Sequence, residues 1–189
     1  MRIIGGSRRG LRLADVGEGD LAAHLRPTSD RVREAIFNLL INAHGNPVTG
    51  ARVLDLFAGT GALGLEALSR GAAEAVFVDD GAKALGLLKA NIAKMKAEAQ
   101  TRILRQDARS LGPNPGAPLT LVFLDPPYGK GLGEAALAVA RKAGWIAPGA
   151  MIVWEEGTAV TPPEGFTLLD HRRYGDTFVT LLSAADLPA

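Results

Sequence analysis

The 189-residue sequence contains no cysteine, which excludes both a disulfide framework and a thiolate metal site. The three histidines, His24, His44 and His171, lack the spacing of metal ligands, so we expect no metal centre. No apolar run approaches the length of a membrane span, and the first residues lack the apolar region of a signal peptide. We therefore expect a cytoplasmic protein that makes no membrane contact.

Net charge is also small, because the chain carries only +1 at neutral pH. Its distribution is more informative, since residues 1–12 hold four arginines and no acid. Arginine is well suited to bidentate contacts with phosphate. The stretch is therefore either a contact surface for nucleic acid or a solvated basic tail. The four residues are Arg2, Arg8, Arg9 and Arg12.

From residue 52 onward, short apolar runs alternate with helical patterns, as in α/β proteins. The expected strands are 52–57, 75–79, 102–106, 119–125 and 150–156, and the expected helices are 62–71, 82–97 and 133–144. Residues 166–184 predict two more strands, which should add an antiparallel edge strand. The prediction is a mostly parallel seven-stranded sheet with helices on both faces.

The first fifty residues do not follow this alternation. Residues 2–13 predict a small hairpin, and 26–45 predict a helix that Thr28 or Ser29 caps and Gly45 ends. The apolar stripe of that helix should pack on the sheet. We divide the chain into a basic N-terminal extension, a helix region that packs on the core, and the main domain. Their ranges are 1–25, 26–50 and 51–189.

The stretch "DLFAGTGALG" raises the question of a nucleotide-like ligand. It contains a G-x-G-x-x-G that starts at Gly59, and Asp79 follows twenty positions later, as in dinucleotide-binding proteins. However, Asp55 directly precedes the loop, and its charge would oppose a pyrophosphate at the following helix. S-adenosylmethionine carries an ammonium and a sulfonium instead, so a neighbouring acid favours it. An ordinary strand-to-helix turn is the remaining alternative.

Acidic residues also stand at the ends of the other expected strands. Asp79 can accept hydrogen bonds from both ribose hydroxyls, and Asp107 from an adenine amino group, with the Ala108 amide beside it. Asp107 could instead cap a helix. Because ligands in such sheets lie across the carboxyl ends of the strands, Asp55, Asp79, Asp107 and Asp125 should converge on one edge.

The fourth strand ends in "LDPPY". Two consecutive prolines hold the chain extended, so the Pro126 carbonyl and the Asp125 carboxylate are directed toward one point. Two such acceptors can grip a nucleobase amino group and favour the pyramidal nitrogen that attacks a methyl group. Tyr128 offers a flat face for stacking on an extruded base. Asp125, Pro126, Pro127 and Tyr128 are therefore the candidate catalytic residues.

The base can be considered separately. Guanine presents two adjacent donors, N1–H and the N2 amino group, and one carboxylate can accept both. Adenine presents a donor beside an acceptor, which an amide matches better. Asp125 therefore favours guanine, although Asp-Pro-Pro-Tyr also occurs in enzymes that resemble the DNA adenine methylases. Asp125 or water could accept the proton that the alkylated nitrogen loses.

Taken together, residues 55–61 and 125–128 resemble the S-adenosylmethionine-dependent amino-methyltransferases of nucleic acids. The segments "RIIGG" and "RPTSDRVREAIFNLL" narrow the likeness to the bacterial RsmD family, which methylates a guanine N2 in 16S ribosomal RNA. The resemblance implies a Rossmann-like class I methyltransferase whose small N-terminal extension helps to hold RNA. The cofactor residues so expected are Asp55, Phe57, Ala58, Gly59, Thr60, Gly61, Asp79, Asp107, Ala108 and Asp125. The candidate RNA contacts are Arg2, Arg8, Arg9, Arg12, Arg26 and Arg31.

Two positions depart from the family pattern. Leu11 stands where a basic residue is usual, which removes one expected RNA contact. Gly81 stands where an acid is usual, so the helix that follows should be less well capped. We expect a monomer that acts on 16S ribosomal RNA, either free or in a small-subunit particle. An adenine methyltransferase, an NAD-linked dehydrogenase and a non-catalytic RNA-binding or assembly factor are the alternatives.

Overall fold

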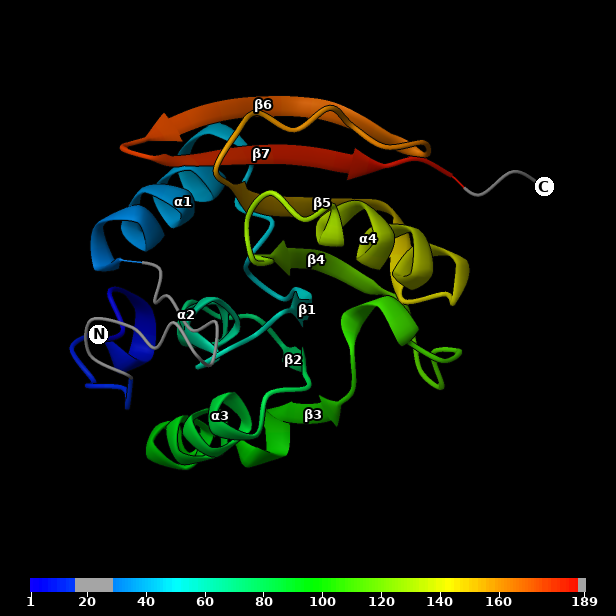
Figure 1. The fold of residues 1–189 in the computed structure, drawn as a ribbon. Helices are drawn as coiled ribbons and strands as arrows, with labels where there is room; N and C mark the ends of the chain where they lie inside the picture. Colours follow the sequence, from blue (N-terminus) through cyan, green and yellow to red (C-terminus); the bar gives the residue numbers. More distant parts are fainter. Residues whose placement is uncertain (16–28, 187–189) are drawn as a thin grey trace.

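The structure, a computed structural model, describes residues 1–15 and 29–186. At its centre is a seven-stranded sheet with the order β3-β2-β1-β4-β5-β7-β6 (Figure 1). The predicted mostly parallel sheet is therefore confirmed. The strands are β1 (Arg52–Leu56), β2 (Glu74–Asp79), β3 (Thr101–Arg105), β4 (Leu119–Leu124), β5 (Ile146–Glu156), β6 (Phe166–Tyr174) and β7 (Thr177–Ala184).

The strand order reverses between β1 and β4. From β1 the chain steps outward through β2 to β3, and it then returns to place β4 on the other side of β1. All of these pairs are parallel, so the carboxyl ends of β1 and β4 lie side by side. In open α/β sheets, ligands bind in the crevice at this point. The topology therefore brings Asp55, near the end of β1, and Asp125, just after β4, to the expected binding edge.

Helices cover both faces of the sheet, as predicted. One core cluster joins apolar residues of α1, α2 and α3 to one face, and a second joins those of α4 to the other. Neighbouring residues of a strand point to opposite faces, so Val53 belongs to the first cluster and Leu54 to the second. The helices are α1 (Asp30–Ala43), α2 (Ala62–Ser69), α3 (Ala82–Met95) and α4 (Leu132–Lys142), with short 3-10 turns η1 (Gly6–Arg8), η2 (Glu98–Gln100) and η3 (Ala108–Ser110).

The closing hairpin adds the predicted antiparallel edge strand. This strand is β6, which pairs antiparallel with β7, and β7 lies between β5 and β6. Burial explains this order, because β7 has a run of fully buried residues while β6 exposes 49% of Leu168 and 44% of Leu169. The more apolar strand takes the inner position, where both of its faces are covered.

The N-terminal segment forms the predicted small hairpin. Arg2 and Arg12 pair across it, the Ile3 amide donates to Leu11 O at 2.9 Å, and η1 makes the turn. Ile3 and Leu13 are buried in the first core cluster. The hairpin is therefore packed onto the main domain and is not a solvated tail.

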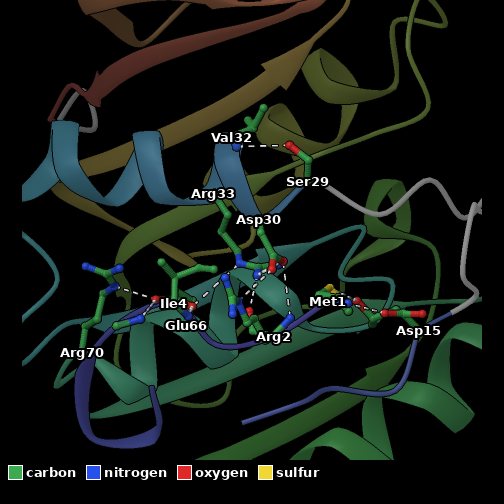
Figure 2. Close-up of polar contacts among 12 residues, drawn as sticks. Met1, Arg2, Ile4, Asp15, Ser29, Asp30, Val32, Arg33, Glu66 and Arg70 are labelled. Atoms are coloured by element: carbon green, nitrogen blue, oxygen red, sulfur yellow. Dashed lines mark hydrogen bonds and ion pairs between the residues drawn. The ribbon is translucent and has the colours of Figure 1, made fainter. Parts of the chain in front are cut away.

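Buried Glu66 of α2 holds this hairpin (Figure 2). Its two carboxylate oxygens accept the amides of Ile4 and Gly5, each at 2.8 Å, and Oε1 also accepts Arg70 Nε at 2.7 Å. A carboxylate that receives several hydrogen bonds is well compensated for its burial. Glu66 therefore links the backbone of the hairpin to the helix behind it.

Helix α1 begins as predicted and contains a buried arginine. The Ser29 side chain accepts the Val32 amide at 3.2 Å, and Gly45 follows the helix in a left-handed conformation. Arg33 of this helix is fully buried. Its guanidinium pairs with Asp30 at 2.8 Å, approaches Glu66 to 3.8 Å and donates to the carbonyl of Arg2 (Figure 2).

Among the described residues, no helix combines the length and the apolar character that a membrane crossing requires.

A pair of helical glycines tests how closely α2 packs on the sheet. A Cβ at Gly64 would lie 2.4 Å from Phe77 Cε1, whereas one at Gly86 of α3 would meet nothing within 4 Å. Gly64→Ala should therefore lower the free energy of unfolding by about 1–3 kcal/mol through overpacking. Gly86→Ala should raise it by about 0.5–1 kcal/mol, because alanine favours helices. Chemical denaturation of both variants measures this, and equal shifts would contradict the packing argument.

Candidate active site

The loop that joins β1 to α2 is held in an unusual backbone conformation. Phe57, Gly59 and Gly61 have φ angles of 59°, 55° and 78°, all in the left-handed region. For phenylalanine this conformation costs about 1–3 kcal/mol, and such residues cluster at ligand sites. The strained backbone therefore favours a ligand site over a purely structural turn, and it lies at the edge where the strand order reverses.

Two glycines of the G-x-G-x-x-G are required by packing. A Cβ at Gly61 would lie 2.4 Å from Leu88 Cδ1, and Gly64 meets Phe77 as described above. Both glycines thus allow α2 to approach the sheet and α3 closely. The sequence interpretation, that glycines let the backbone approach a cofactor, stays a prediction for Gly59 and Gly61. Ala58 and Thr60, each 8% exposed, complete the loop.

Asp55 lies buried at the start of α2. Helix α2 has Gly61 at its N-cap and no side-chain cap of its own, but Asp55 Oδ2 accepts the Gly64 amide at 2.9 Å. Asp55 therefore caps the helix from the neighbouring strand, where the helix dipole also favours a negative charge. Burial raises the pKa of Asp55 well above its usual range, although the bond from Gly64 opposes the rise.

Asp79, at the end of β2, ties the glycine loop to the start of α3. Its Oδ2 accepts the Gly59 amide and its Oδ1 accepts the Gly81 amide, both at 2.8 Å. Burial raises its pKa too, against these two amides. The Gly81 position gives α3 no side-chain cap, as the departure from the family pattern predicts.

Three of the four strand-end acids come together. The charges of Asp125 and Asp79 add to the raised pKa of Asp55, so these carboxylates lie within electrostatic reach of one another. Asp107 instead caps a short helix, which is the second role that the sequence allows it. It accepts the Arg109 amide at the start of η3 and forms an ion pair with the Arg109 side chain at 2.5 Å. The hydrogen bond from Arg109 lowers the pKa of Asp107. Its contact with adenine, and that of buried Ala108, stay predictions.

The corner after β4 is fixed by contacts with the end of β5. The Tyr128 ring packs against Gly157, where a Cβ would lie only 3.0 Å from Cδ2, and the Tyr128 hydroxyl is 3.4 Å from Thr177 Oγ1. Glu156 accepts the amides of Gly129 at 2.9 Å and Gly157 at 2.5 Å. With Pro126 buried and Asp125 and Pro127 half-buried, the segment is a rigid corner beside the acid cluster.

The arginines expected to contact RNA lie on the surface wherever the structure describes them. Arg2, Arg8, Arg9 and Arg12 are exposed on the docked hairpin, and Arg31 is exposed on α1. Arg2 also lies 3.4 Å from Asp30. Arg26 lies outside the described residues. Within the described part of the chain, no three acidic or histidine side chains gather as metal ligands would.

Comparison with known proteins identifies the family. Residues 1–183 match the family described as Conserved hypothetical protein 95. Ribosomal RNA small subunit methyltransferase D of Escherichia coli K12 is 41% identical over 172 residues, which are 89% of this chain and 82% of that protein. The chain belongs to the RsmD family.

Two further comparisons extend over most of this RsmD-family chain. Ribosomal RNA small subunit methyltransferase D of Haemophilus influenzae is 34% identical and covers 93% of the chain and 89% of its own length. The solved structure of yhhF from Escherichia coli is 35% identical, with a TM-score of 0.82 and 98% of both chains covered. The fold is the Rossmann-like class I methyltransferase fold, as the resemblance implies.

Sequence reasoning missed several polar residues that shape this RsmD-family site. Glu66 and Asn91 are both fully buried, and Glu156 holds the corner after β4 by accepting the Gly129 amide. Glu66 had a detectable signal, because it is the one charged residue in the otherwise apolar or small "ALGLEALS". Asn91 and Glu156 carried no comparable signal, since their partners lie far away in the sequence or in a loop.

The buried acid predicts an unusual pH dependence. Because the pKa of Asp55 is higher in the folded chain, ionising it opposes folding, and stability should fall as pH rises from about 4 toward that raised value. Asp55→Asn keeps an acceptor for Gly64 without the charge. It should raise the free energy of unfolding at pH 7 and flatten the decline.

Asp107→Asn is the matched control, because the pKa of Asp107 is lowered. Its charge supports folding at neutral pH, so this variant should not gain stability there. Denaturation curves between pH 4 and 8 measure both effects. A loss of stability in Asp55→Asn at pH 7 would show that the charge itself supports the fold.

Proposed function

We propose that this chain transfers a methyl group from S-adenosylmethionine to the exocyclic N2 amino group of a guanine in 16S ribosomal RNA. The observation that carries the proposal is the gathering of Asp55, Asp79 and Asp125 beside the glycine loop and the Pro-Pro-Tyr corner. Relatives named ribosomal RNA small subunit methyltransferase D support an rRNA methyltransferase.

The charge of the site suits this cofactor better than a dinucleotide. Burial and mutual repulsion raise the pKa of Asp55, and burial raises that of Asp79, so a cationic ligand that keeps both ionised gains binding energy. A pyrophosphate would add repulsion. Each Asp79 oxygen accepts one amide and retains acceptor capacity for a ribose hydroxyl.

The corner residues supply the remaining chemistry. When bound, S-adenosylmethionine supplies an electrophilic methyl group, whose bond to sulfur breaks as the bond to nitrogen forms. Asp125 and the Pro126 carbonyl accept the N–H groups of the target amine and orient its lone pair. Tyr128, held by Gly157 and Thr177, stacks on the base. Asp125 or water takes the proton that leaves nitrogen.

Guanine is favoured because Asp125 can accept both N1–H and N2–H. The second candidate is N6 methylation of adenine, since the same corner can hold that amino group as well. The RNA backbone would lie over the hairpin, which carries four exposed arginines and whose backbone Glu66 holds at the amides of Ile4 and Gly5. We assign this activity to a cytoplasmic monomer that acts on free 16S ribosomal RNA or on a small-subunit particle.

Methyl transfer should depend on the carboxylate of Asp125. Asp125→Asn replaces one acceptor by a donor that faces the target amine, so kcat should fall by about 100-fold or more. The measurement is transfer of labelled methyl groups to small-subunit RNA or particles from cells that lack the activity. Asp186→Asn, at the exposed C-terminal end of the described chain, is the control and should keep full activity.

Nucleoside mass spectrometry of the product decides between the two bases. N2-methylguanosine supports the proposal, and N6-methyladenosine would replace it with the second candidate. No incorporation into RNA or particles, with intact binding of S-adenosylhomocysteine, would contradict both.

The hairpin arginines should contribute electrostatic affinity for RNA. The double variant Arg8→Gln, Arg9→Gln should bind 16S ribosomal RNA about ten-fold more weakly and lower the slope of log affinity against log salt by roughly 1–2. Lys142→Gln on α4, which covers the other face of the sheet, should change neither quantity. Filter binding over a salt series measures both, and equal effects in the two proteins would exclude the hairpin as a contact.

A further inference from the structure

Asn91, in the middle of α3, joins two parts of the molecule that are far apart in the sequence. The side chain is fully buried. Its Oδ1 accepts the Ala14 amide at 2.6 Å, and its Nδ2 donates to the carbonyls of Ala14 and Thr60, both at 3.0 Å. Ala14 directly follows the basic hairpin, and Thr60 belongs to the glycine loop. One amide thus holds the hairpin and the loop together.

An apolar residue would suit this helix position better if packing were the only demand. The neighbouring Ile92 and Met95 lie in the first core cluster, and asparagine is a weaker helix former than leucine. Without Asn91, three backbone groups would lose their side-chain partner in the protein interior, and each would be unfavourable there if left unsatisfied. The bridge is therefore a specific connection between two backbone segments.

The connected segments are also linked through α2. The hairpin rests on the later part of this helix, where Ser69 Oγ accepts the Arg8 amide at 2.9 Å and donates to Gly5 O at 2.6 Å. The same helix begins at the end of the glycine loop. All eight residues of α2 are buried, so it can transmit a shift of one end to the other with little internal change.

We propose that Asn91 is a positioning residue that couples RNA binding at the hairpin to cofactor binding at the glycine loop. The inference rests on the function proposed above. If each ligand favours the arrangement that Asn91 holds, then each tightens the binding of the other by the same factor, because such coupling is reciprocal. The bridge would thereby favour RNA binding to enzyme that already holds its methyl donor.

The test compares the affinity for 16S ribosomal RNA with and without saturating S-adenosylhomocysteine. In the unmodified protein the ratio of the two dissociation constants should be about five-fold or more, within the usual range of such coupling. Asn91→Leu removes all three hydrogen bonds. Asn91→Asp keeps an acceptor for the Ala14 amide and loses the donors to the Ala14 and Thr60 carbonyls. Both should bring the ratio below about two.

Met95→Ala is the control for a general loss of stability. Met95 is buried on the same helix, so this variant should lower the melting temperature while leaving the bridge in place, and it should keep the coupling ratio. Thermal unfolding of all variants sets a temperature at which each is folded. Calorimetric titration of S-adenosylhomocysteine with and without RNA should give the same ratios in the reverse direction.

The outcomes separate this inference from the proposed function. A ratio of dissociation constants that falls below about two in both Asn91 variants, but not in Met95→Ala, supports the coupling. A ratio near one in the unmodified protein, an unchanged ratio in the Asn91 variants, or an equal loss in Met95→Ala would overturn it, even if methyl transfer proceeds. An unmodified protein that binds neither ligand would overturn the proposed function and the coupling with it.

Discussion

The structure depends above all on how α2 is held. This short helix is buried along its whole length and starts at a glycine that provides no cap. Asp55 of β1 supplies the missing cap, because it accepts the Gly64 amide in the first turn of α2. Glu66, in the middle of α2, accepts the amides of Ile4 and Gly5 in the hairpin. The glycine loop and the hairpin both take their positions from this helix. The glycine loop and the N-terminal hairpin are therefore both held by α2.

The capping role of Asp55 does not explain why the residue is charged. A neutral asparagine or serine could accept the same amide without the desolvation that raises the pKa of Asp55. Asp79 presents the same combination of backbone hydrogen bonds and unfavourable burial. Two carboxylates kept at a cost to stability, beside a strained Phe57, match what is expected of a site built for a cationic ligand.

Local sequence patterns were sufficient for the strands, the helices and the gathering of three strand-end acids. Short apolar runs indicate the strands, and parallel topology then brings Asp55, Asp79 and Asp125 to one edge. The pattern could not show that Asp107 pairs with Arg109, because an acid after a strand can cap a turn or contact a ligand equally well. It also could not order β6 and β7, since the order depends on pairing across the whole sheet.

The sequence patterns also did not indicate which polar residues are buried with partners far away in the chain. Arg33 looks like its exposed neighbour Arg31 in the sequence, yet it is buried because Asp30, Glu66 and the Arg2 carbonyl surround it. Two of these three partners come from other segments, so a local window around Arg33 contains only Asp30.

The contacts that hold the hairpin also affect how its arginines would bind RNA. On a solvated tail, arginines would lose conformational entropy each time they bound phosphate. On a hairpin fixed by Glu66, Ser69 and Asn91, the backbone is already ordered before RNA arrives. Under the proposed function, affinity would come from preorganisation as well as from charge, and the core of the protein would set the orientation of the RNA relative to the Pro-Pro-Tyr corner. The basic segment, which the sequence alone presents as a separate extension, is thus held by the same core that holds the glycine loop.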